Sequence, residues 1–218
     1  MDDSTTAGAP ALRITVEEVR AAEFAAVPML EFALRIANPG GPEVRSVTLD
    51  TQIRISAARR AYDEPSRRRL AELFGGPEAW SWNLRGLLWA QTVTQVPAFG
   101  AGTAATIRVP CTYDFEVAVA KYFHGLTDGE VPLEFLFSGT TWYVAGGRLR
   151  VTRIPWDTEA DFRMPVTVWK DVMDRHFPGG AWLRLDRDTF DRLHAYRTRH
   201  VLPGWDDVVG RLLKEAGG

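Results

Sequence analysis

Residues 30–36 read LEFALRI, a run in which every second side chain is large and apolar. A period of two is typical of a β-strand that buries one face, whereas an amphipathic helix repeats every three to four residues. Residues 47–55 show the same alternation, and the segment Asn38-Pro39-Gly40-Gly41-Pro42 between the two runs has the composition of a turn. We therefore predict two strands that form a hairpin.

The alternation continues along the next hundred residues and is interrupted by one segment with helical character. That segment spans residues 63–74, where Asp63-Glu64-Pro65 is typical of a helix start. Further strands are predicted at 87–96, at 107–119 as two consecutive strands bent at Pro110, at 131–137, and in a hairpin of 141–145 with 148–154 around Gly146-Gly147. About eight or nine short strands at this spacing predict an α+β, mainly β fold: an antiparallel two-layer β-sandwich over residues 12–156, with an inserted helix near 64–74.

The two ends of the chain differ from this middle part. Residues 1–11 are acidic and rich in small side chains, so we predict a disordered tail there. The last quarter has apolar residues at helical spacing in three segments: residues 165–177, a helix capped by Asp186, and a helix that begins near Trp205. We predict that residues 157–218 form a helical C-terminal extension of amphipathic helices packed on the sandwich, because three such helices bury little on their own.

Composition narrows the classes of function. The chain has 218 residues, 45% of them hydrophobic and 25% charged, with a formal net charge of −2. Nucleic-acid binders usually carry a strong positive field, so no nucleic-acid partner is expected. No apolar run approaches the roughly 18 residues of a membrane span, so no membrane insertion is expected. The single cysteine, Cys111, excludes a disulfide framework or a multi-thiolate metal site and favours the cytoplasm.

Motifs for catalysis or cofactor binding are weak. The run GAGTAA at residues 100–105 matches a dinucleotide-binding pattern, but a strand follows it where that motif needs a helix. Cys111 and His124 would make a nucleophile and base only if the fold joined them, and the alternation places Cys111 on a buried face. The acidic run at residues 157–161 imitates a calcium loop, yet Phe162 stands where the loop needs glycine, so we expect a solvated acidic loop. We expect no catalytic residue, no cofactor and no metal site.

Two surface features remain. Five arginines lie within eleven residues around the predicted helix, and this basic patch suits an acidic partner, although a solvated helix face is the simpler interpretation: Arg59, Arg60, Arg67, Arg68 and Arg69. Trp80 and Trp82 share parity in a loop-like segment, and one or both are candidate exposed anchors. The candidate interaction surface therefore comprises Arg67, Arg68, Trp80 and Trp82.

Three stretches resemble an uncharacterised bacterial protein family whose genes often neighbour nickel–iron hydrogenase genes. They are Phe32–Pro39, Val109–Val117, and the tail from Trp182-Leu183-Arg184-Leu185 through Leu202-Pro203-Gly204-Trp205. The resemblance covers nearly the whole chain after the tail at 1–11 and brings no catalytic motif. It implies an accessory role, with a hydrogenase component or maturation factor as the partner.

Three classes of function follow. The first is a non-enzymatic protein-interaction or accessory module, which predicts an exposed apolar patch. The second is a carbohydrate- or small-ligand-binding β-sandwich, which predicts coplanar exposed aromatic side chains at a concave site. The third is an enzyme of unrecognised type, which predicts a cleft with at least two strongly perturbed titratable groups. The first is favoured, and the oligomeric state stays open.

Overall fold

The computed structural model describes residues 8–112, 114, 117–180 and 184–217. The chain divides into two compact units, Met1–Ala181 and Trp182–Gly218. Most of the predicted tail lies outside the described residues. The first unit extends beyond residue 156, where the predicted sandwich ends. One further strand and one helix, at residues 159–176, also belong to it.

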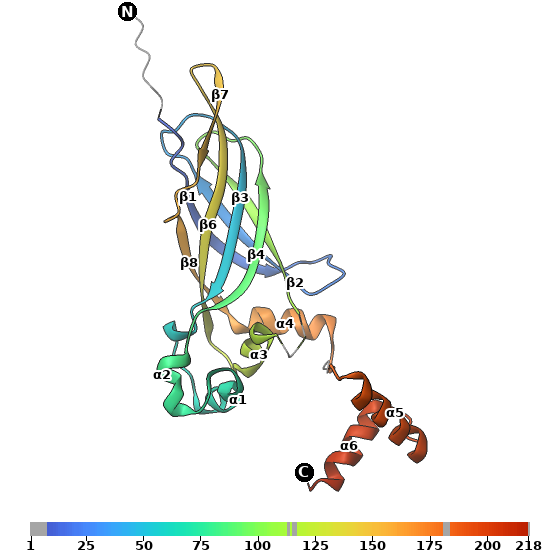
Figure 1. Cartoon of the computed structure of the whole chain (residues 1–218). Coiled ribbons are helices and arrows are strands. Elements are labelled where there is room, and N and C mark those ends of the chain that lie inside the picture. Colours follow the sequence, from blue (N-terminus) through green and yellow to red (C-terminus); the bar gives the residue numbers. More distant parts are fainter. Residues whose placement is uncertain (1–7, 113, 115–116, 181–183, 218) are drawn as a thin grey trace, which may run out of the picture. The chain divides into compact units, whose positions relative to one another are not determined.

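The first unit contains two antiparallel sheets (Figure 1). The smaller sheet has the order β1-β2-β5, and the larger has the order β4-β3-β6-β7, with β8 paired to the other part of β6. The fold is therefore the predicted α+β, mainly β, two-layer antiparallel arrangement. The strands are β1 (Arg13–Ala21), β2 (Met29–Ala37), β3 (Val44–Ile55), β4 (Leu87–Val96), β5 (Gly102–Pro110), β6 (Glu130–Ala145), β7 (Arg148–Arg153) and β8 (Glu159–Pro165).

The core lies between the inward faces of the two sheets. Every second residue of LEFALRI is fully buried there, and the Phe32 ring meets the Phe135 ring of β6 edge to face at 5.2 Å between centroids. Each large apolar side chain buried in this way stabilises the fold by about 1.5–3 kcal/mol. The period-two pattern that predicts the strands therefore also defines the core.

The predicted hairpin of β2 and β3 is wrong, because the two strands belong to different sheets. Strands of a hairpin turn their apolar faces to the same side, whereas β2 and β3 turn theirs toward each other across the core. The connecting turn is held by Asn38, whose Nδ2 donates to the carbonyl oxygens of Pro42 at 2.8 Å and Gly100 at 3.2 Å. This turn carries the chain from one sheet to the other.

The helices of the first unit gather at one end of the sheets (Figure 1). The helix expected near residues 64–74 is present, and the Asp63 side chain caps it by accepting a hydrogen bond from the Ser66 amide at 3.0 Å. The elements are η1 (Ala57–Arg59), α1 (Glu64–Phe74), η2 (Pro77–Ala79), α2 (Trp80–Asn83), α3 (Ala118–Gly125) and α4 (Val166–His176).

Two expectations from the sequence fail in this unit. The second strand predicted after Pro110 is wrong: β5 ends at Pro110, and none of the described residues from 111 to 117 belongs to a strand. Residues 118–119 begin α3, because Val119, Tyr122 and Phe123 follow helical spacing and are buried. Tyr113 and Phe115, expected on the same strand, lie outside the described residues. Residues 159–161 of the acidic run, expected as a solvated loop, belong to β8, where pairing with β6 overrides their low strand propensity.

The predicted helices of the C-terminal quarter are present in both units. In the first unit, α4 packs on the sheets and buries Trp169 and Val172 in the shared core. In the second unit, α5 (Arg187–His200) is capped by Asp186, which accepts a hydrogen bond from the Thr189 amide at 2.7 Å. It precedes α6 (Trp205–Glu215). Of the three predicted helices, α4 packs on the sheets, while α5 and α6 belong to the second unit.

Candidate functional site

The structure separates the two tryptophans of the predicted interaction surface. Trp82 is 80% exposed, whereas Trp80 is 8% exposed, so Trp80 as an exposed anchor is wrong. Both lie on α2, where residues two apart point to opposite sides of a helix; on a strand they would share a face. Arg67 and Arg68 are exposed on α1.

Trp80 fixes α2 to α1. Its Nε1 donates to the carbonyl oxygen of Gly75 at 2.9 Å, directly after the end of α1. Its ring meets those of Tyr62 and Phe74 edge to face, with centroids 5.1 and 5.7 Å away. Asn83 adds a hydrogen bond from Nδ2 to the carbonyl oxygen of Phe74 at 3.1 Å. The short helix that presents Trp82 is therefore anchored on both sides of that residue.

A small cavity of about 230 Å³ lies against the buried Trp80. The guanidinium carbon of Arg67 lies 5.9 Å from the centre of the Trp80 ring, and that of Arg60 lies 5.1 Å from the centre of the Tyr62 ring. Both are cation–π distances. We call this cavity the arginine–tryptophan pocket; it is lined by Arg60, Ala61, Tyr62, Arg67, Trp80 and Leu84.

The two arginines of this pocket have no carboxylate partner in the described part of the chain. Arg60 donates to the backbone carbonyl oxygen of Asp128 at 3.0 Å. This acceptor is neutral, so it does not compensate the charge of the guanidinium group. The acids nearest in sequence are already engaged: Asp63 caps α1 and accepts a hydrogen bond from Thr127 at 2.8 Å, while Glu64 pairs with Arg68. Hydrogen bonds from Ser66 and Thr127 hold the pKa of the Asp63 carboxyl below its usual range.

Two tyrosines form a neutral support beneath the pocket. The hydroxyl of Tyr62 donates to the carbonyl oxygen of Ala57 at 2.6 Å and lies 2.9 Å from the hydroxyl of Tyr122. Burial raises the pKa of both phenols, so neither becomes an anion that would neutralise the arginines.

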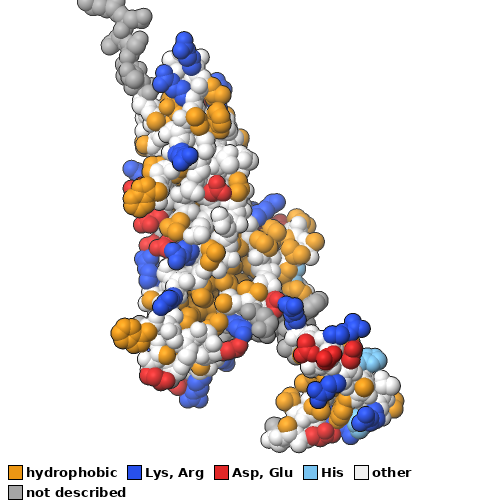
Figure 2. Space-filling model, in the orientation of Figure 1, with side chains coloured by type: hydrophobic (Ala, Val, Ile, Leu, Met, Phe, Trp, Pro, Cys, Tyr) orange, Lys and Arg blue, Asp and Glu red, His pale blue; other side chains and the backbone are white. Residues whose placement is uncertain are grey.

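This arrangement suits a carboxylate. Guanidinium groups bind carboxylates through charge-assisted hydrogen bonds, and the aromatic walls limit hydration of the pair. The cavity is smaller than the roughly 300–1,000 Å³ of sites that enclose a drug-sized ligand. Figure 2 shows exposed hydrophobic side chains beside basic ones over this helical end of the first unit.

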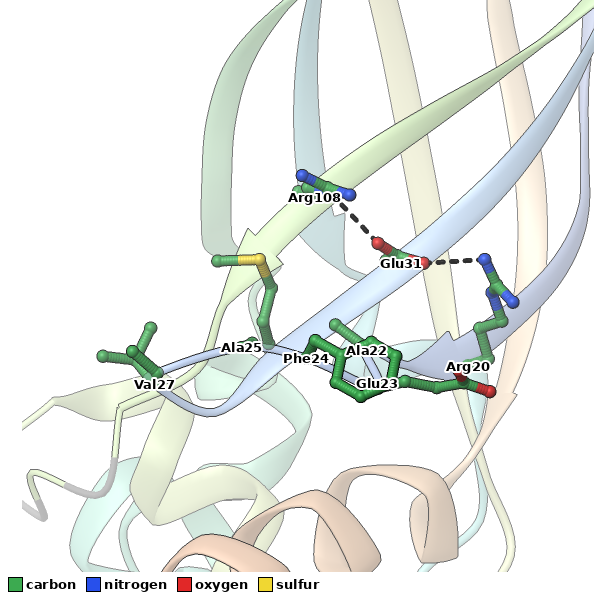
Figure 3. A pocket seen from close by; sticks show the side chains of 10 residues that line it. Arg20, Ala22, Glu23, Phe24, Ala25, Val27, Glu31 and Arg108 are labelled. Carbon is green, nitrogen blue, oxygen red and sulfur yellow. Dashed lines mark hydrogen bonds and ion pairs between the residues drawn. The ribbon is translucent and has the colours of Figure 1, made fainter.

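Sequence reasoning missed a second pocket, of about 460 Å³, beside the loop at 22–28 that joins β1 to β2 (Figure 3). Here Arg20 and Arg108 both donate to the nearly buried Glu31, at 2.9 and 3.0 Å. Glu31 lies opposite Arg20 on β1 and opposite Arg108 on β5. Only the strand register brings the three together, so no local motif announces them. Both arginines therefore have a carboxylate partner within the protein, although they share it.

The remaining motifs have structural roles. Cys111 is buried, and burial raises the pKa of its thiol to about 12. The GAGTAA run leads into a strand and not into a helix, as predicted, because β5 begins at Gly102. Asp161 of the calcium-like run receives two hydrogen bonds from Arg59, at 2.6 and 2.8 Å. Among the residues that the structure describes, no group of three or more His, Cys, Asp or Glu side chains is placed to hold a metal ion. Within the same residues, no helix has the length and apolar character to cross a membrane.

The chain is thus a mainly β protein with a helical end that carries an arginine-rich pocket. The model of the family of unknown function DUF6084 matches residues 9–218, and the chain belongs to this family. Comparison with curated protein sequences gives no match.

Several solved structures are distantly similar. The CARDB domain of a Pyrococcus furiosus protein is 11% identical, with 71% of this chain and 91% of that chain covered and a TM-score of 0.28. A putative ApaA protein from Bordetella pertussis is 14% identical, with 72% and 96% covered and a TM-score of 0.27. β-Glucosidase 3B from Thermotoga neapolitana is 15% identical, with 71% and 17% covered and a TM-score of 0.26. At these scores the similarity assigns neither a ligand nor an activity to this chain.

Proposed function

We propose that this protein is a non-enzymatic interaction module that captures an acidic segment of a partner protein at the arginine–tryptophan pocket. One observation carries the proposal: Arg60 and Arg67 line a cavity of about 230 Å³ with aromatic walls, and neither forms an ion pair within the described residues. A bound carboxylate would supply the missing counter-charge. Arg68, paired with Glu64, extends the basic surface along α1.

Burial decides how much such contacts contribute. An ion pair on an open surface contributes about 0–1 kcal/mol, while a hydrogen bond to a charged group in a sheltered site contributes about 1.5–3 kcal/mol. The pocket is partly sheltered because Tyr62 and Trp80 form its walls. Trp82 stands two residues further on α2 as an exposed anchor, and tryptophan and arginine are the residue types enriched at interface hot spots.

The first partners to examine are hydrogenase components and maturation factors. This choice rests on the resemblance to a family whose genes neighbour nickel–iron hydrogenase genes. The cytoplasm is the proposed compartment, in keeping with a single buried thiol. A small-ligand-binding sandwich is the second candidate, because the same pocket would accept a free carboxylate. Titration with free glutamate separates the two, since a pocket built for a partner's side chain gains most of its affinity from the surrounding interface.

Site-specific photocrosslinking in the native cell tests the proposal. In the full chain, Trp82→p-benzoylphenylalanine should form one dominant adduct with a partner, identified by mass spectrometry. Charge reversal by Arg60→Glu with Arg67→Glu should remove that adduct, and Arg67→Glu alone should weaken it. The single variant keeps the test informative if the double variant unfolds.

The matched control reverses two exposed arginines of the sheets, Arg13 and Arg54, which form no ion pair with a described residue. Arg13→Glu with Arg54→Glu should leave the adduct intact. An adduct that survives reversal of Arg60 and Arg67 in a folded protein, or that is lost equally in the control, contradicts the proposed pocket.

A further inference from the structure

Strand β7 is an edge strand on a projecting ribbon. It pairs with residues Thr140–Ala145 of β6, while β8 pairs with residues Glu130–Leu136 at the other part of the same strand. In the described part of the chain, no strand pairs with the outer edge of β7. The backbone donors and acceptors of that edge are therefore available to another strand.

One face of this ribbon is apolar and exposed. Trp142 lies opposite Val151, and Val144 lies opposite Leu149, and opposite residues of an antiparallel pair point to the same face. Trp142 is 41% exposed, Val151 54% and Leu149 60%. A single exposed leucine is normal on a protein surface. A stripe of apolar side chains across two strands, beside an unpaired strand edge, is typical of an interaction site.

The other face of β7 is basic. Arg148 lies opposite Ala145 and Arg150 opposite Tyr143, so both side chains point away from the apolar stripe. Both are exposed, and neither forms an ion pair with a described residue. Figure 2 shows basic and hydrophobic side chains together at the end of the first unit where β7 lies. From Arg148 to Val151, basic and apolar residues therefore alternate with the period of a strand, while Arg153, opposite Thr140, ends the apolar face.

We propose that β7 binds an extended segment of another protein as an added strand, in which apolar and acidic residues alternate. The apolar side chains of that segment would extend the stripe formed by Trp142, Leu149 and Val151. The acidic side chains would lie beside Arg148 and Arg150, whose charges are otherwise unpaired. Main-chain hydrogen bonds supply affinity in this mode of recognition, and the alternating side chains supply specificity.

A second copy of this chain fits the edge poorly. Antiparallel pairing of two β7 strands keeps equivalent faces together, so the arginines of one copy would lie opposite or diagonal to those of the other. Like charges in these positions are destabilising. The arginines thus oppose self-pairing and favour an acidic partner strand. This surface lies outside the arginine–tryptophan pocket and stands independently of the function proposed for it.

The test uses the full chain and an acetylated, amidated peptide of alternating valine and glutamate. Binding should protect the backbone amides of β7 from hydrogen exchange and shift their NMR signals. Arg148→Glu with Arg150→Glu should lower the affinity about tenfold, because two attractive cross-strand contacts become repulsive. Leu149→Ser with Val151→Ser should lower it while leaving the arginines in place. A valine–lysine peptide should not bind.

Three controls locate the effect. A valine–glutamate peptide N-methylated at alternate residues should fail to protect β7, because it cannot complete the ladder. Arg13→Glu with Arg54→Glu should keep the affinity, which excludes a general charge effect. Arg60→Glu with Arg67→Glu should also keep it, so failure of the pocket and failure of this edge give different results. Absence of protection on β7, equal binding of the N-methylated peptide, or self-association of the wild type through β7 overturns the proposal.

Discussion

Two pockets of the first unit carry a pair of arginines each, and they differ in what those arginines contact. Arg20 and Arg108 share the carboxylate of Glu31, which the register of three strands places between them. Arg60 and Arg67 lie over aromatic rings and have no carboxylate partner among the described residues. The number of arginines is equal, so the availability of their charge depends on where the fold places its acids.

The acids beside the second pair are committed elsewhere. Asp63 stands close to Arg60 and Arg67 in sequence, but its oxygens accept hydrogen bonds from the amide of Ser66 and the hydroxyl of Thr127. Asp63 therefore caps α1 and forms no ion pair with Arg60 or Arg67. The difference teaches that a basic cluster becomes a candidate site when local structure occupies its neighbouring acids.

The largest expected effect concerns the stability of the helical end that supports this pocket. Trp80→Ala should lower the free energy of unfolding by about 3–5 kcal/mol, because it removes a large buried ring and its hydrogen bond to Gly75. Trp82→Ala, an exposed control on the same short helix, should change it by no more than about 0.5 kcal/mol. Urea denaturation followed by circular dichroism measures both. Equal effects would show that α2 is not anchored as described.

Charge reversal separates the two pockets next. Arg60→Glu with Arg67→Glu should lower the affinity for an acidic partner about tenfold or more, since one charge-assisted hydrogen bond contributes about 1.5–3 kcal/mol. Arg20→Glu with Arg108→Glu should leave partner binding intact but destabilise the fold, because it strands the nearly buried Glu31 among like charges. Affinity measured by titration calorimetry, with thermal melts of each variant, checks both halves. Loss of partner binding in the second variant while it remains folded would reverse the assignment.

Neutralising Glu31 should make the first pocket resemble the second. Glu31→Gln keeps the shape of the side chain and removes the charge that Arg20 and Arg108 share, at a cost of about 1 kcal/mol in stability. We expect the variant to gain binding of an anionic peptide at this face, seen as shifts of the Arg20 and Arg108 side-chain signals by NMR. If the signals stay unchanged in an excess of peptide, the Glu31 carboxylate is not what prevents Arg20 and Arg108 from binding an anion.

The smallest effect is the pH dependence of the α1 cap. Hydrogen bonds from Ser66 and Thr127 hold the pKa of the Asp63 carboxyl below its unfolded value of about 3.9. Asp63 therefore contributes stability that is fully present above about pH 4 and is lost as the pH falls through the lower folded value. Asp63→Asn should be less stable than the wild type at neutral pH, and the two melting temperatures should converge in acid. A difference that grows on acidification would have the wrong sign.

Local pattern predicts much of this molecule. Alternation predicts the buried face of β2, the run Asp63-Glu64-Pro65 predicts the start of α1, and Asp186 as a cap predicts the start of α5. The basic cluster that contains Arg67 is also visible in the sequence. These features are local, so neighbouring residues suffice to identify them.

Features that depend on tertiary contacts could not be predicted in the same way. Alternation cannot say whether β2 and β3 share a sheet or face each other, because both arrangements bury the same residues. Parity placed Trp80 and Trp82 together because it assumes a strand, whereas α2 turns them apart. The contact of Glu31 with Arg108 joins residues 77 apart in sequence, and only strand pairing reveals it.

In the proposed function, Arg60 and Arg67 bind an acidic segment of a partner, while Arg20 and Arg108 stay paired with Glu31. NMR titration of the arginine Nε–Hε signals of the full chain with a short peptide of aspartate, glutamate and one phenylalanine measures this directly. We predict saturable shifts of the Arg60 and Arg67 signals, with those of Arg20 and Arg108 unchanged. Equal, non-saturating shifts of all four arginines would contradict the proposal.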